Sequence, residues 1–121
     1  MKALVVDDSA VMRKILIGAL GRAKITEVDQ ASDGQEAVTA VGQNDYCLVL
    51  MDWNMPNMLG IEAVKAIRAA GKTVPIIMVT TEAEKSRVLE ALKAGANNYI
   101  IKPFEPDAIV DKILQAIEKA A

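Results

Sequence analysis

The chain has 121 residues, 52% of them hydrophobic and 25% charged, with a formal net charge of −2. This length and composition are typical of one globular domain with its own core. The balanced charge and an aromatic content of 3% argue against a nucleic-acid-binding surface. The absence of histidine and the single cysteine exclude an internal disulfide, a zinc cluster and a nucleophile activated by histidine.

The same features bear on where the protein works. The longest purely apolar run, Tyr46 to Met51, is far shorter than the roughly 20 residues of a membrane-spanning helix. Asp7 and Asp8 come too early for the apolar stretch of a signal peptide. A single cysteine fits a reducing compartment. We therefore expect a cytoplasmic protein that binds neither membranes nor nucleic acids.

Short apolar runs predict five β-strands. They are residues 3–6, 26–31, 46–51, 76–79 and 99–101. Except for the second, which is weaker, the runs are continuous and do not alternate with polar residues. Continuous runs are typical of strands that are buried on both faces of a sheet.

Segments with the apolar spacing of helices lie between these runs and after the last one, beginning with Met12 to Leu20. Glycines stand where the first four helices are expected to end, and a proline stands where the last is expected to begin. These residues are Gly21, Gly42, Gly71, Gly95 and Pro106.

The repeated strand–helix pattern predicts an α/β fold with a parallel sheet, right-handed crossovers and helices on both faces. The expected arrangement is a doubly wound, flavodoxin-like (βα)5 sheet with strand order 2-1-3-4-5. No linker divides the chain, so we expect one domain over residues 1–121 without an output domain. Ligands of this architecture bind beyond the carboxyl ends of the strands, and the residues there are the candidates for function.

Charged and polar residues stand at four of those ends. Asp7 and Asp8 follow the first strand, Asp52 follows the third, Thr80 follows the fourth and Lys102 follows the fifth. Three converging carboxylates repel one another unless a cation is present, and Mg²⁺ prefers carboxylate, water and phosphate oxygens. Lysine and threonine can bind a phosphoryl group through charge and a hydroxyl donor. We expect a Mg²⁺-assisted phosphoryl-transfer site with the central carboxylate, Asp52, as the covalent acceptor.

Each of these residues also has a purely structural interpretation. Asp7 and Asp8 could cap the first helix, Asp52 and Lys102 could be solvated, and Thr80 suits the interior of a strand. The phosphoryl-transfer interpretation is favoured because complementary groups at four strand ends are much less frequent together than any one of them alone.

Four stretches resemble the receiver domains of two-component response regulators, and those of chemotaxis most of all. They are residues 5–9 (VVDDS), 51–56 (MDWNMP), 78–80 (MVT) and 101–104 (IKPF). The resemblance covers essentially the whole chain. It implies the flavodoxin-like fold, a cis peptide between Lys102 and Pro103, and a signalling switch that catalyses only its own phosphorylation and dephosphorylation.

The resemblance also assigns roles to the matching residues. Asp52 would accept a phosphoryl group from a histidine kinase. Mg²⁺ would be bound by the carboxylates of Asp8 and Asp52 and by the backbone carbonyl of Asn54, with Asp7 reaching the metal through water. Mg²⁺ is therefore the expected cofactor, and a kinase of the chemotaxis type is an expected partner.

The remaining roles concern the switch and its readout. Lys102 would contact the phosphoryl group, Thr80 would swing inward to bind it, and Tyr99 would turn inward after Thr80. Asn54 and Glu82 stand where relatives tune the lifetime of the acyl phosphate. A partner would then read a surface on the fourth helix, fifth strand and fifth helix. The residues expected on or near that surface are Lys85, Val88, Tyr99, Ile101 and Lys112.

The favoured function is a monomeric chemotaxis switch that binds a flagellar motor switch protein, or another phosphorylation-dependent partner, when phosphorylated. One alternative is a phosphorelay intermediate that passes the phosphoryl group to a histidine phosphotransfer protein. Another class, the Mg²⁺-dependent aspartyl phosphatases, separates its two aspartates by one residue, whereas Asp7 and Asp8 are adjacent. An interaction module that is never phosphorylated would not need the complete set of residues.

Overall fold

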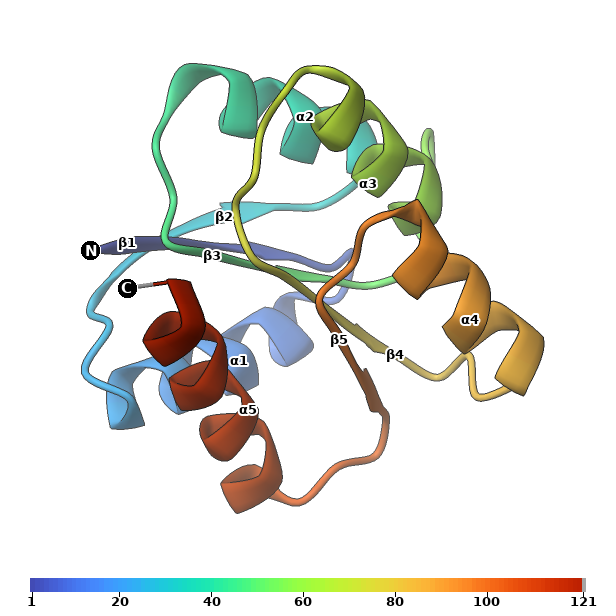
Figure 1. Ribbon diagram of the computed structural model, residues 1–121. Coiled ribbons are helices and arrows are strands. Elements are labelled where there is room, and N and C mark those ends of the chain that lie inside the picture. Colours follow the sequence, from blue (N-terminus) through green and yellow to red (C-terminus); the bar gives the residue numbers. More distant parts are fainter. Residues whose placement is uncertain (121) are drawn as a thin grey trace.

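The computed structural model describes residues 1–120. Five parallel strands form one sheet in the order β2-β1-β3-β4-β5, with helices on both faces (Figure 1). The strands are β1 (Lys2–Val6), β2 (Glu27–Ala31), β3 (Leu48–Met51), β4 (Ile76–Thr80) and β5 (Asn98–Ile101). The helices are α1 (Ala10–Arg22), α2 (Gly34–Gln43), α3 (Gly60–Ala69), α4 (Lys85–Ala94) and α5 (Pro106–Ala120). The predicted fold class and strand order are confirmed.

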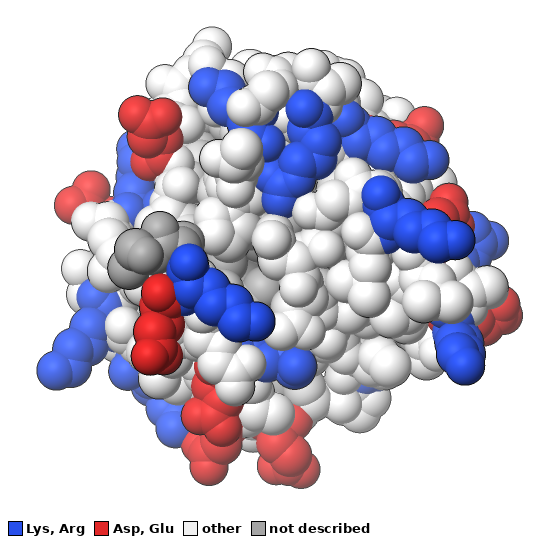
Figure 2. All heavy atoms as spheres, in the orientation of Figure 1, with Lys and Arg blue, Asp and Glu red and all other residues white. Residues whose placement is uncertain are grey.

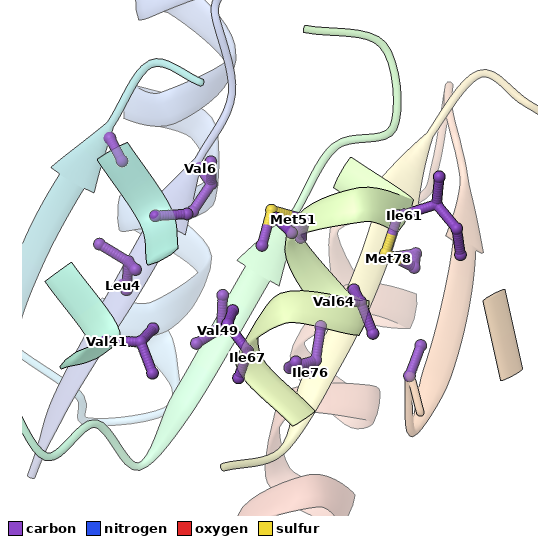
Figure 3. Close-up of a cluster of buried hydrophobic side chains, with 14 of the residues drawn as sticks. Leu4, Val6, Val41, Val49, Met51, Ile61, Val64, Ile67, Ile76 and Met78 are labelled. Atoms are coloured by element: carbon purple, nitrogen blue, oxygen red, sulfur yellow. The ribbon is translucent and has the colours of Figure 1, made fainter. Parts of the chain in front are cut away.

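The sheet separates two hydrophobic clusters. Residues of α1 and α5 pack on one face, and residues of α2, α3 and α4 pack on the other. Figure 3 shows the second cluster, in which Val64 and Ile67 of α3 lie against the side chains of β3 and β4. β3 and β4 are buried throughout because helices cover both of their faces. β2 lies at the edge of the sheet and is only partly buried, which explains its weaker apolar pattern.

Two of the four glycines end their helices as the sequence predicts. Gly71 and Gly95 follow α3 and α4 with φ of 81° and 120°, in the left-handed region that favours glycine. Gly21 and Gly42 instead lie in the last turns of α1 and α2, each of which continues for one further residue. After α1, Lys24 adopts the left-handed conformation, with φ of 67°.

The helix starts also follow local chemistry. α5 begins at Pro106, as predicted. α3 begins after Leu59, which has no side-chain acceptor for a cap, and the Glu62 carboxylate instead accepts a hydrogen bond from the Leu59 N–H at 3.0 Å. The peptide between Lys102 and Pro103 is cis, as the resemblance implies.

The molecular surface carries both signs of charge. On the face in Figure 2, basic and acidic side chains are interspersed around the rim, consistent with the balanced composition. Among residues 1–120, no helix has the length and apolar character that crossing a membrane requires.

Candidate functional site

The register of the parallel strands places the acidic residues side by side. Val6 of β1 pairs with Met51 of β3, so Asp7 and Asp52 are the next residues on adjacent strands. The Asp52 N–H donates to the Val6 carbonyl at 2.9 Å and extends the ladder by one step. One carboxylate oxygen from each of Asp7, Asp8 and Asp52 lies within 4.8 Å of the others. The carboxylates that the sequence predicts to converge are therefore together.

Lys102 enters this cluster from the far strand of the sheet. Thr80 of β4 pairs with Ile101 of β5, and the Lys102 N–H donates to the Thr80 carbonyl at 2.9 Å. The Lys102 Nζ lies 2.7 Å from Asp7 Oδ2 and 3.3 Å from Asp52 Oδ2. One ammonium thus bridges two carboxylates that come from two other strands.

The cluster is largely removed from solvent and is negatively charged. The side chains of Asp7 and Asp52 are 1% and 10% exposed. Burial raises the pKa of Asp52, while the Thr80 hydroxyl and the Lys102 ammonium act in the opposite direction. Lys102 neutralises one of the three carboxylates, which leaves two negative charges for a divalent cation. Three clustered oxygens with this charge fit Mg²⁺, which takes carboxylate ligands and keeps several waters.

The aspartates after β1 do not cap the first helix. The N-cap of α1 is Ser9, whose Oγ accepts a hydrogen bond from the Met12 N–H at 3.2 Å. The Asp7 Oδ1 accepts the Ser9 N–H at 2.9 Å, while Asp8 is exposed at the mouth of the cluster. The capping interpretation is therefore wrong, because serine takes that role.

Glu82, in the loop between β4 and α4, contacts three residues that the sequence places at the site. Its N–H donates to the Thr80 Oγ1 at 3.3 Å, and its carbonyl accepts the Tyr99 hydroxyl at 2.7 Å. Its carboxylate accepts the Asn54 side-chain amide at 3.2 Å. Burial, with a smaller contribution from Glu82, raises the pKa of Tyr99 to about 12. This loop therefore connects the end of β4 to the half-buried tyrosine.

The residues expected on a partner surface lie on three elements. Lys85 and Val88 are on α4, Tyr99 and Ile101 are on β5, and Lys112 is on α5. Ile101 is 44% exposed. The Lys112 Nζ donates to the Asn98 Oδ1 at 3.2 Å and joins α5 to β5.

Sequence reasoning missed residues that support the site through hydrogen bonds to its backbone. The Arg13 Nη1 donates to the backbone carbonyl of Asp7 at 2.7 Å, and its Nε donates to the Gln30 Oε1 at 2.9 Å. The Gly60 N–H donates to the Trp53 carbonyl at 2.8 Å and closes the loop after β3. Arginine on a helix carries no distinctive sequence signal, so only the structure identifies Arg13.

Comparison with known proteins agrees with the family resemblance found in the sequence. Residues 3–114 match the family described as the response regulator receiver domain. The chain belongs to the response regulator receiver family. This receiver is 50% identical over 116 residues to a chemotaxis protein CheY homolog of Campylobacter jejuni, covering 93% of this chain and 89% of that protein. It is 47% identical over 116 residues to chemotaxis protein CheY1 of Helicobacter pylori, covering 93% of this chain and 94% of the relative.

Solved structures agree with the fold of this receiver. The receiver domain of the Francisella response regulator 1452 superimposes with a TM-score of 0.92 at 27% identity, covering 99% of this chain and 98% of that one. The chemotaxis response regulator CheY4 of Vibrio cholerae superimposes with a TM-score of 0.85 at 35% identity, covering 95% and 97% of the two chains. This receiver is thus a signalling domain of the CheY-like chemotaxis type.

Removal of the bridging ammonium is expected to destabilise the metal-free receiver. In Lys102→Met the buried carboxylates of Asp7 and Asp52 lose their cation, and breaking a buried ion pair costs about 3 kcal/mol. Urea unfolding at neutral pH should show this loss, and millimolar Mg²⁺ should reduce it. The raised pKa of Asp52 means that its charged form destabilises the fold at neutral pH. The loss of unfolding free energy in Lys102→Met should therefore become smaller as Asp52 becomes protonated in acid.

Lys112→Met is the matched control, because the Lys112 ammonium donates to a neutral group, the side chain of Asn98. We expect it to change the unfolding free energy by less than about 1 kcal/mol. Equal losses in the two variants would contradict a special role for the Lys102 bridge.

Proposed function

We propose that this receiver is a chemotaxis response regulator that takes a phosphoryl group from a histidine kinase onto Asp52 and thereby changes its affinity for a partner. The observation that carries the proposal is the Lys102 ammonium placed between Asp7 and Asp52 in a buried acidic cluster. The chemotaxis names of the relatives favour a motor-control role.

The chemistry is a transfer between two nucleophiles. A carboxylate oxygen of Asp52 attacks the phosphorus, the bond between phosphorus and the imidazole nitrogen of the donor breaks, and its electron pair returns to the imidazole. A bound Mg²⁺ would supply positive charge to the phosphoryl oxygens. Asp8, Asp52 and the Asn54 carbonyl would hold the metal, and Asp7 would reach it through water. The Lys102 ammonium neutralises the remaining charge and orients the phosphoryl group.

The switch follows from the new charge. A phosphoryl group carries roughly 1.5 to 2 negative charges, in place of the single charge of the Asp52 carboxylate, and brings strong hydrogen-bond acceptors beside Thr80. The Thr80 hydroxyl, buried beside Asp52 and 3.3 Å from the Glu82 N–H, gains its phosphoryl partner only in that state. Tyr99 is bonded to the same loop through the Glu82 carbonyl, so the position of the loop and the burial of the tyrosine are linked. Phosphorylation thus stabilises one arrangement of this loop over others.

Phosphorylation is expected to increase the affinity for a peptide of a flagellar motor switch protein that binds across α4, β5 and α5. Ile101→Ala should weaken binding of the phosphorylated receiver about tenfold, because the apolar side chain that the partner would cover is lost. Fluorescence anisotropy of a labelled peptide, with Mg²⁺ and acetyl phosphate present, measures this affinity.

The control is Val11→Ala, which truncates an apolar side chain of α1 that is 70% exposed. It should leave peptide binding unchanged, and neither variant should alter the yield of phosphorylated protein. Peptide binding that does not depend on phosphorylation would contradict the motor-control role. Fast transfer of the phosphoryl group to a histidine phosphotransfer domain would favour the phosphorelay role instead.

A further inference from the structure

A buried carboxylate outside the acidic cluster holds the loop that follows β3. Asp33 is the N-cap of α2 and its Oδ1 accepts the Glu36 N–H at 2.8 Å. Its other oxygen, Oδ2, accepts the side-chain amide of Asn57 at 2.7 Å. Asp33 is only 7% exposed, so Asn57 satisfies a carboxylate oxygen that has little access to water.

The backbone around Asn57 is fitted to this contact. Asn57 has φ of 67°, in the left-handed region that asparagine tolerates better than most residues. The next residue, Met58, accepts the Gly34 N–H on its carbonyl at 3.2 Å. A Cβ on Gly34 would collide with that same carbonyl. Two adjacent residues of the loop are thus bound to two adjacent residues at the start of α2.

These bonds matter because of what the loop carries. Residues 52–59 connect β3 to α3, and the Gly60 N–H closes the loop by donating to the Trp53 carbonyl. Asn54 lies in the segment between the two attachments. Its backbone carbonyl is the proposed metal ligand that lies farthest along the chain from the end of its strand. Apart from the side-chain bond to Glu82, its position therefore depends on how the loop is held.

We propose that Asn57 and Asp33 form a latch that positions the Asn54 carbonyl for Mg²⁺ and so sets the metal affinity of the receiver. Asn57 is a positioning residue in this proposal, which rests on the proposed metal site. With the latch closed, the carbonyl is already in place when the metal arrives. With the latch open, binding must also order the loop, and part of the binding free energy is lost to that ordering.

The test removes the amide without straining the backbone. Glycine adopts positive φ freely, so Asn57→Gly deletes only the contact with Asp33 and the restriction on the loop. We expect its Mg²⁺ dissociation constant to rise about tenfold, the lower end of the effect of removing a residue that supports a metal ligand. Trp53 is the single tryptophan of the chain, and its fluorescence during a MgCl₂ titration, checked by titration calorimetry, measures the constant.

Two further variants separate the latch from general loosening. Lys24→Gly likewise introduces glycine at a non-glycine residue of positive φ, here in the turn before β2, and should bind Mg²⁺ like the wild type. The exchange Asp33→Asn with Asn57→Asp keeps the net charge, leaves a good cap on α2 and restores a donor opposite a carboxylate. It should recover an affinity within about threefold of the wild type, since the amide–carboxylate pair is re-formed.

The outcomes distinguish the latch from the metal site itself. A wild type that binds no Mg²⁺ would overturn the metal site and the latch with it. A wild type that binds Mg²⁺ with an affinity that Asn57→Gly retains would overturn the latch alone. Equal losses in Asn57→Gly and Lys24→Gly, or an exchange variant as weak as Asn57→Gly, would likewise overturn it.

Discussion

Asp52→Asn is expected to abolish the phosphorylated form of this protein. The asparagine amide has no carboxylate oxygen that could attack phosphorus. Asp52 follows the central strand of the sheet, and its carboxylate lies 3.3 Å from the Lys102 Nζ. The wild type, incubated with Mg²⁺ and acetyl phosphate, should gain the mass of one phosphoryl group. The adduct should need Mg²⁺, be labile in base as an acyl phosphate, and be absent from the variant by intact-mass spectrometry.

Asp45→Asn provides the matched control. Asp45 is exposed in the connection between α2 and β3, at the opposite end of the sheet from the acidic cluster, and this variant should be phosphorylated like the wild type. An adduct that persisted in Asp52→Asn would identify a different acceptor. A wild type that formed none would favour an interaction module that works without phosphorylation.

Gly60→Ala should destabilise the protein by about 3 kcal/mol, the upper range for forcing an extra methyl group into a packed site. A Cβ at Gly60 would overlap the backbone carbonyl of Asp52 and press on the Cα of Trp53. These are backbone atoms, which cannot move aside as a flexible side chain can. The shift must displace the loop after β3 and, with it, Asp52, the proposed phosphoacceptor. Urea unfolding measures the loss, and the rate of phosphorylation by acetyl phosphate should fall in the same variant.

Gly18→Ala is the opposite case and serves as its control. Gly18 lies inside α1, and a Cβ there would meet no atom within 4 Å. Alanine should therefore stabilise this helix by about 0.5–1 kcal/mol relative to glycine. If both alanine variants were more stable than the wild type, the close approach of Gly60 to the Asp52 carbonyl would be refuted.

The fold and the acidic cluster are predictable from the sequence because both follow from short-range patterns. Continuous apolar runs mark buried strands, and parallel strands bring their carboxyl ends to one edge of the sheet. Once Val6 is placed beside Met51, the positions of Asp7 and Asp52 follow without further information. Lys102 follows in the same way from the pairing of Thr80 with Ile101.

The supporting contacts are not predictable in this way. Asp33 and Asn57 are far apart in the chain, and each looks like an ordinary residue of a turn or a helix start. Their hydrogen bond depends on how α2 and α3 pack side by side, which no local pattern encodes. Arg13 is a similar case, since its contact with the Asp7 carbonyl depends on the path of α1.

The helices differ in how firmly they are anchored. Five residues of α3 are buried, whereas in α4, which the structure describes throughout, only Ala91 is buried. An element with so little apolar area under it opens locally at low free energy, so its amide hydrogens should exchange with solvent before those of α3. A partner that holds α4 against the sheet would make that exchange slower. Binding would then include the entropic cost of ordering α4, and this cost is smaller when phosphorylation has already restricted the helix.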